Sequence, residues 1–172
     1  MARLTGDDFD ALFDSYEHTA FRLEIRESYL GVAYEPEPYR RFIAGEPDDG
    51  EWIKDWCDGV RTRSAEGKTM HRVRVVNLPP SDYTRFSLQV SQRWNIPAGE
   101  DIRYLVRSAA DGLPNHDFWL FDSSRLYLMH YDDQDAPLGA ELIEDPATIV
   151  QHNYFRDLAW HRAVVPAVFP AA

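Results

Sequence analysis

Apolar residues recur along the chain at two spacings, one typical of helices and one typical of strands. Near the N-terminus, Phe9, Leu12 and Phe13 fall on one side of a helix after Thr5, which is expected to cap it. Residues 21–25 then alternate between apolar and charged side chains, the two-residue period of a half-exposed strand. The chain is therefore expected to begin with a short amphipathic helix and a strand.

The next apolar segments predict two more helices. Residues 39–43 follow a proline-rich break and place their apolar side chains on one side of a short helix. Residues 51–67 predict a second amphipathic helix that ends in a turn at Gly67 and carries Trp52 and Trp56 on its inner side. Because aromatic side chains contribute large buried areas, we assign both tryptophans to the core rather than to a ligand site.

The clearest supersecondary unit covers residues 70–106. Residues 70–76 predict a strand, and Ser81 is placed to cap a helix that begins at Asp82. Residues 102–106 predict a second strand after the turn at residues 97–99. A strand, helix and strand of this length form a βαβ crossover, so the two strands should be parallel and should neighbour each other or nearly so.

The C-terminal third predicts a hairpin and a closing helix. Residues 118–121 and 125–131 are apolar runs joined by a short polar loop, which favours antiparallel pairing, and residues 141–143 are expected to add a short strand. Asp145 before Pro146 predicts the start of a long helix. The tail from residue 164 onward is expected to fray.

These elements predict the α/β (α+β mixed) fold class, with a single domain over residues 1–172. Its mixed sheet combines the βαβ crossover with the following antiparallel hairpin, and helices pack on the sheet. Within the domain we expect residues 1–65 to form a helix-rich covering part and residues 66–166 to form the sheet-bearing core. A chain of 172 residues buries roughly 70% of its unfolded surface, enough for a self-sufficient core.

Composition indicates the cellular compartment of the protein and the classes of partner that it is expected to bind. Cys57 is the only cysteine, so no intramolecular disulfide can form, and we expect a cytoplasmic protein. The chain has no apolar run of about 18 residues and no apolar signal segment, so we expect no membrane association. The net charge of −11 repels phosphate backbones, and direct nucleic-acid binding is therefore not expected.

The search for catalytic motifs removes several classes of chemistry. The sequence has no GxxxxGK[ST] or GxGxxG loop, so no cofactor is expected, and it has no GxSxG nucleophile motif. It has no HExxH motif, and its histidines are scattered, so no metal site is expected either. We assign no catalytic residue, and an enzymatic activity is left open but not favoured.

Charged residues on strands that otherwise look buried are the remaining candidates for a site. One interpretation is that they form structural ion pairs, with Glu24, Glu100 and Asp101 as carboxylate partners of the arginines. The other is an anion-binding cleft at the C-terminal ends of the parallel strands, where ligands of open α/β sheets bind. The ligand-binding candidates are Arg72, Arg74, Arg85, Glu100, Arg103, Arg107, His116, Asp117 and Asp122.

Four segments, RVRVV, SDYTRF, AGEDIRYLVR and DFWLFD, carry a resemblance to a known family. The chain resembles an uncharacterised actinobacterial domain family, and the similar pattern extends from FRLEIRESY to FRDLAWHRAV. Members of that family are typically encoded beside helix-turn-helix regulators of development and secondary metabolism. The resemblance implies a regulatory role and a helix-turn-helix regulator protein as partner, and it implies no particular chemistry.

The order of elements is also distantly similar to one half of a phospholipase D-like domain. That superfamily needs a histidine that attacks phosphorus, a lysine two residues later and an acid further on. Here His116 is followed by Phe118 at the lysine position, and Asp122 lies one position early. The similarity therefore implies a degenerate version of the fold, without phosphodiesterase chemistry of that type.

Two functions from different classes follow from these observations. The first is a noncatalytic regulatory or partner-binding module that works with a helix-turn-helix transcriptional regulator through protein–protein interaction and an acidic surface. The alternative is an enzyme or ligand sensor that acts on a phosphorylated small molecule or nucleic acid through an arginine-lined cleft. In the alternative, His116, Asp117 or Asp122 would transfer protons. A toxin or antitoxin role is a third and weaker option.

Overall fold

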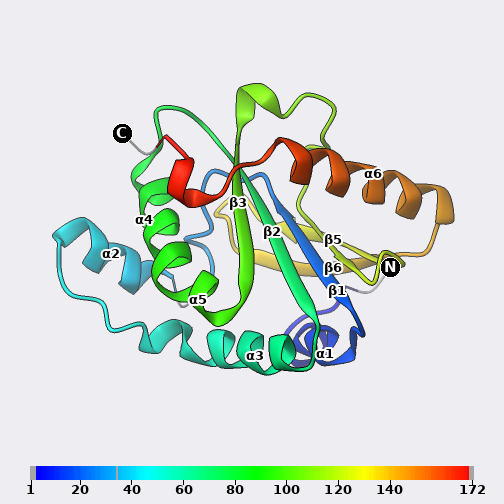
Figure 1. Cartoon of the computed structure of the whole chain (residues 1–172), viewed down its shortest axis with the longest axis horizontal. Coiled ribbons are helices and arrows are strands. Elements are labelled where there is room, and N and C mark those ends of the chain that lie inside the picture. Colours follow the sequence, from blue (N-terminus) through cyan, green and yellow to red (C-terminus); the bar gives the residue numbers. More distant parts are fainter. Residues whose placement is uncertain (1–2, 34, 171–172) are drawn as a thin grey trace.

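The computed structural model of the chain describes residues 3–33 and 35–170 and contains one six-stranded sheet (Figure 1). The strand order is β3-β2-β1-β4-β5-β6. The first three strands of this order are parallel and the remaining pairs are antiparallel. The strands are β1 (Thr19–Glu24), β2 (Thr69–Val76), β3 (Glu100–Val106), β4 (Phe118–Phe121), β5 (Arg125–Tyr131) and β6 (Pro137–Ile143). The predicted single α/β domain with a mixed sheet is confirmed.

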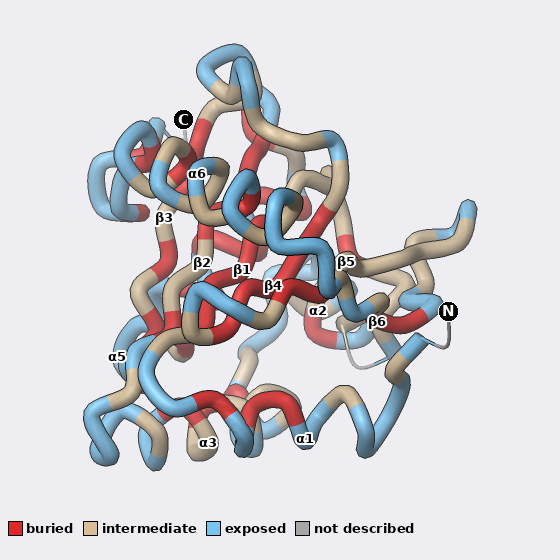
Figure 2. Tube along the Cα trace, turned by 90° about the vertical axis from the view of Figure 1, so that its right-hand side faces the viewer, coloured by how far each residue is buried: buried red, intermediate tan, exposed pale blue. Residues whose placement is uncertain are grey.

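Helices cover both faces of the sheet, with α6 on one face and α1, α3, α4 and α5 on the other (Figures 1 and 2). The core under α6 combines aliphatic and aromatic side chains. The core on the opposite face is centred on three aromatic side chains, Phe13, Trp119 and Phe121. The α-helices are α1 (Asp7–Ser15), α2 (Pro36–Ala44), α3 (Lys54–Ala65), α4 (Asp82–Val90), α5 (Ile96–Ala98) and α6 (Pro146–Arg162). Short turns of other helix types are η1 (Glu51–Ile53), η2 (Ser91–Asn95), η3 (Arg107–Ala109) and η4 (Pro166–Val168).

The sequence signals that place the starts of α4 and α6 are confirmed. The Ser81 side chain accepts a hydrogen bond from the Thr84 backbone N–H at the start of α4. Asp145 does the same for Thr148 at the start of α6, with a proline in the first turn. A side-chain oxygen at this position satisfies a backbone donor that the helix leaves without a partner. The parallel pairing of β2 with β3 and the antiparallel β4–β5 hairpin are confirmed as well.

Three details differ from the sequence-based expectations. Thr5 does not cap α1, because the helix begins after Gly6 and no side chain caps it. Strand β1 is not half-exposed, since Arg22 and Glu24 are only 3% and 5% exposed. The third strand of the hairpin region, β6, is longer than the expected residues 141–143, because pairing with β5 extends to Pro137.

The C-terminal tail is ordered against the sheet, so the expected fraying is wrong. Val164 forms an antiparallel bridge with Tyr104 on the outer edge of β3, through hydrogen bonds of 2.8 and 2.9 Å. Phe169 then packs on Tyr104 and is only 6% exposed. The tail thus covers part of an edge that would otherwise present unpaired backbone groups.

Strand β1 lies at the centre of the sheet, between β2 and β4. It comes from residues 1–65, which were expected to cover the sheet, and it carries charged side chains into the interior. Among the described residues, no helix has the length and apolar character needed to cross a membrane.

Candidate functional site

Charged side chains form a row inside the protein, on the face of the sheet that α3 and α4 cover. Most of them come from the neighbouring parallel strands β1, β2 and β3. In the pairing register, Arg22 lies beside Arg72 and Glu24 lies beside Arg74. We call this row the sheet network, and it consists of Arg22, Glu24, Arg72, Arg74, Glu100 and Asp117.

Glu24 is the centre of the sheet network. Its Oε1 lies 2.8 Å from Arg72 Nη1 and 3.6 Å from Arg22 Nε. Its Oε2 lies 2.8 Å from Arg74 Nε. One buried carboxylate therefore serves three guanidinium groups, each of which would be costly to bury alone.

Asp117 closes one end of the row. Its Oδ2 accepts hydrogen bonds from Arg22 Nη2 at 2.8 Å and from the Tyr29 hydroxyl at 2.7 Å. Its Oδ1 accepts from the Ile25 backbone N–H at 2.9 Å. Arg22 Nη2 also donates to the Tyr131 hydroxyl at 2.7 Å. The carboxylate thus ties the loop after β1 to the start of β4.

Glu100 closes the other end. Arg72 Nε donates to Glu100 Oε1 at 2.7 Å. Glu100 Oε2 accepts from Trp56 Nε1 at 3.1 Å and from Asn95 Nδ2 at 3.0 Å. The side chain is fully covered and connects the sheet to α3 and to the η2 turn.

The surroundings hold the central groups of the network in their charged forms. Burial would raise the pKa of the Glu24 carboxyl, but the three surrounding arginines lower it to about 2. Burial would lower the pKa of Arg22, but Tyr131 and Asp117 raise it above its ordinary value. A carboxylate that is held ionised is a poor proton acceptor near neutral pH, and guanidinium groups held by carboxylates are not free to bind a phosphate.

The sheet network takes four of the nine candidate residues and leaves five elsewhere. Arg72, Arg74, Glu100 and Asp117 belong to it. The other five do not share a pocket with them or with one another. They are Arg85, Arg103, Arg107, His116 and Asp122.

Each of these five residues has a partner outside the sheet network. Arg85 is exposed on α4 and pairs with Asp82. Arg103 lies on the other face of the sheet, with its guanidinium 3.7 Å from the ring centre of Trp160. The partners of the remaining three are the Ile25 and Val75 carbonyl groups for Arg107, His152 for His116, and the backbone N–H groups of residues 17–19 for Asp122.

The sequence reasoning missed Arg22 as a member of the sheet network, and Tyr29 and Tyr131 as its hydrogen-bond partners. Arg22 was assigned to the solvated side of a strand, because alternating charged residues usually face water. The sequence did contain a signal for this cluster. In three strands that the topology brings together, the charged residues fall on alternate positions that face the same side of the sheet. Glu24 and Glu100 were expected as carboxylate partners, and both pair with arginines.

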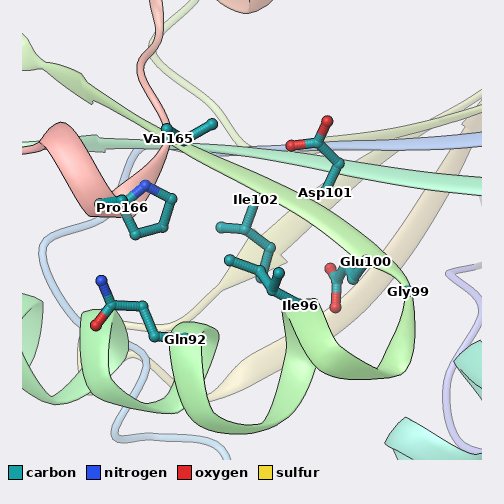
Figure 3. Close-up of a pocket in the computed structure, with 9 residues that line it drawn as sticks. Gln92, Ile96, Gly99, Glu100, Asp101, Ile102, Val165 and Pro166 are labelled. Atoms are coloured by element: carbon teal, nitrogen blue, oxygen red, sulfur yellow. The ribbon is translucent and has the colours of Figure 1, made fainter.

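A separate groove of about 420 Å³ lies beside edge strand β3, between the turn at α5 and the C-terminal tail (Figure 3). Ile96 and Val165 form its apolar walls and are 38% and 44% exposed. Glu100 lines it, but the carboxylate of this residue is already bonded within the sheet network. The second carboxylate that lines it, Asp101, lies 3.5 Å from Arg103 Nη2, so the groove offers mainly shape and apolar surface.

The six charges of the sheet network cancel, so the negative net charge of the protein comes from residues outside the network. Three arginines face three carboxylates inside the protein, so the whole net charge of −11 is carried by the rest of the chain. On helix α1, Asp7, Asp8 and Asp10 are exposed, and none of them has an ion-pair partner among the described residues. Within residues 3–33 and 35–170, no three histidine, cysteine or carboxylate side chains gather to hold a metal ion.

The comparisons with known proteins add a family and no activity. A family model described as a domain of unknown function (DUF6879) matches residues 7–169. None of the curated proteins matches the chain.

Proposed function

Because the chain belongs to the DUF6879 family, for which no activity is described, we propose its function from its own geometry. It is a noncatalytic regulatory module that binds a basic protein partner, and the partner is a helix-turn-helix transcriptional regulator. The observation that carries the proposal is the separation of charge, with a neutral network inside and the net charge of −11 outside.

The charge distribution suits association with a positively charged surface. Helix α1 presents Asp7, Asp8 and Asp10 to solvent on the side of the molecule that α3 also covers (Figure 1). Carboxylates without local partners produce a field that steers a basic protein and is weakened by salt. Electrostatic complementarity of this kind contributes mainly to the association rate and to the choice of partner.

A DNA-binding regulator is a suitable partner because its DNA-contacting face is rich in lysine and arginine. The resemblance to proteins encoded beside helix-turn-helix regulators supports the same partner. Both proteins would then act in the cytoplasm, and the acidic module would compete with DNA for the basic face of the regulator.

The alternative, a sensor or enzyme for a phosphorylated ligand, has less support. It requires arginines that are free to bind an anion, whereas Arg22 and Arg72 are each held by two carboxylates. Arg74 is held by Glu24. Binding a phosphate there would require these pairs to break inside the protein, where the desolvation cost is highest.

Gel filtration of the chain mixed with a helix-turn-helix regulator of the kind that the resemblance implies tests the proposal. We expect a complex at about 10 μM protein that dissociates as the salt concentration is raised, since screening shortens the reach of the acidic field. The absence of association at this concentration in low salt would refute the proposed partner.

A charge-neutralising variant locates the contact surface. We expect the triple change Asp7→Asn, Asp8→Asn and Asp10→Asn to weaken the complex about tenfold, equivalent to about 1.4 kcal/mol. The matched control, Asp111→Asn, Glu144→Gln and Asp157→Asn, removes the same charge near α6 and should leave the affinity within about twofold. Equal losses from both variants, measured by isothermal titration calorimetry, would show that α1 is not the contact surface.

A further inference from the structure

Two histidines from distant parts of the chain meet on the face of the sheet covered by α6. His116 lies just before β4, and His152 is in the second turn of α6. Their Nε2 atoms are 2.9 Å apart, which is hydrogen-bond distance. His152 Nδ1 lies 2.8 Å from the Thr148 carbonyl oxygen, and the His152 residue is only 3% exposed.

The hydrogen bonds fix where the protons are. The Thr148 carbonyl can only accept, so His152 Nδ1 must carry a hydrogen. Neutral His152 then has a lone pair on Nε2, and His116 Nε2 must carry the hydrogen that lies between the two rings. The pair can also hold one extra proton on His116 Nδ1 without losing this bond. A second extra proton would place two N–H groups and two positive charges against each other.

The surroundings do not compensate that second charge. Phe118 and Phe155 pack edge-on against the His152 ring. Among the described residues, neither His116 nor His152 has a carboxylate within ion-pair distance.

The charged groups nearest to the pair are already occupied. Asp117 follows His116 in the chain, but its carboxylate is bonded to Arg22 in the sheet network. On β5, His130 interacts electrostatically with His116, and its Nε2 is bonded to Glu141 on β6. Asp117 favours a proton on His116, and the Thr148 carbonyl favours one on His152, but burial opposes protonation of both rings and each is lowered overall in pKa.

We propose that the His116–His152 pair is an acid-operated latch between α6 and the segment leading into β4. The latch is closed with no extra proton or one, and it opens when both imidazoles are protonated. Opening separates His116 from the first half of α6, while Arg162 in the second half still binds the Ala109 and Asp111 carbonyl groups. Neutral pH keeps the latch closed, and acid releases it.

The direction of the pH dependence follows from the titration of the two rings. Burial lowers the pKa of both, and in His116 the neighbouring His152 lowers it further below the ordinary value of 6.5. Separated, solvated rings take up protons at higher pH than the closed pair. The closed state is therefore fully favoured above pH 6.5 and loses stability as the pH falls below it, by up to about tenfold per pH unit for each proton that it excludes.

Nuclear magnetic resonance of the wild-type chain tests the geometry without any substitution. At pH 7.5, imidazole nitrogen shifts should show His152 with its hydrogen on Nδ1 and His116 with its hydrogen on Nε2. On acidification both rings should titrate below pH 6.5. A hydrogen on Nε2 of His152 at pH 7.5, or titration of both rings at 6.5, would overturn the proposal.

Hydrogen exchange tests the opening. Between pH 7.5 and pH 5.0, after correction for intrinsic exchange rates, protection of residues 149–155 in the first half of α6 should fall at least tenfold in the wild type. His152→Gln should remove this pH dependence, and the exposed His161→Gln control should keep it. In His152→Gln the pKa of His116 should also rise toward 6.5. Equal pH dependence in the wild type and His152→Gln would overturn the latch.

Discussion

Replacing Glu24 with glutamine is expected to destabilise the protein by roughly 3–5 kcal/mol, the usual cost of removing one partner from a buried ion pair. The change keeps the shape of the side chain but removes the charge shared by Arg22, Arg72 and Arg74. All three guanidinium groups remain in the interior, where an uncompensated charge is expensive. Urea denaturation at pH 7 measures the loss.

Glu37 provides a matched control for this change. Its carboxyl also has a pKa lowered to about 2, through hydrogen bonds from Arg40 and Arg41, but it is exposed on α2. Glu37→Gln should be indistinguishable from the wild type, because solvent and salt replace a surface pair at little cost. If the two variants unfold at the same urea concentration, burial of the sheet network does not determine its contribution to stability.

Replacing Asp117 with asparagine is expected to cost roughly 3–5 kcal/mol as well. Asparagine retains one carbonyl oxygen but cannot serve Arg22, Tyr29 and the Ile25 backbone N–H together. The buried guanidinium of Arg22 then loses the closer of its two carboxylate partners. Thermal unfolding monitored by circular dichroism measures the effect.

Asp122 is the control for Asp117 because it also accepts several hydrogen bonds, from the backbone N–H groups of Glu17, His18 and Thr19 and, at 3.4 Å, from the surface side chain of Arg125. It lies nearer the surface, in a turn with a φ of 50° that asparagine adopts readily. Asp122→Asn should therefore cost only about 1 kcal/mol. A larger loss at Asp122 than at Asp117 would contradict the assignment of Asp117 to the sheet network.

Much of the fold could be predicted because its signals are local. Ser81 and Asp145 cap helices through bonds within three residues, so the sequence alone locates α4 and α6. The short polar loop before Arg125 similarly specifies the β4–β5 hairpin. These features depend on neighbours in the sequence and not on distant partners.

The burial of β1 could not be predicted in the same way. Arg22 and Glu24 are charged and alternate with apolar residues, which is typical of a strand with one solvated face. They are buried because Arg72 on β2, and Asp117 at the start of β4, neutralise them across the sheet. That compensation is non-local, so it is invisible until the strand order is known.

The candidate site was predicted in part for the same reason. The expectation that arginines pair with Glu24 and Glu100 identified the core of the network. The expectation of one shared cleft failed for Arg103. Side chains alternate between the two faces along a strand, and Arg103 points to the face opposite to the sheet network. The tail from residue 164 was expected to fray, yet Val164 pairs with the edge of β3, a contact with a distant strand.

A double-mutant cycle between Glu24 and Arg72 tests most directly whether the charges inside the sheet serve the fold. The free energies of unfolding of Glu24→Gln, Arg72→Met and the double variant are compared with the wild type in urea at pH 7. We expect each single change to be strongly destabilising and the double variant to be more stable than the sum predicts, with a coupling energy of roughly 1–3 kcal/mol. Single changes that leave stability unaltered and add independently would contradict a structural network and would favour arginines that are free to bind a ligand.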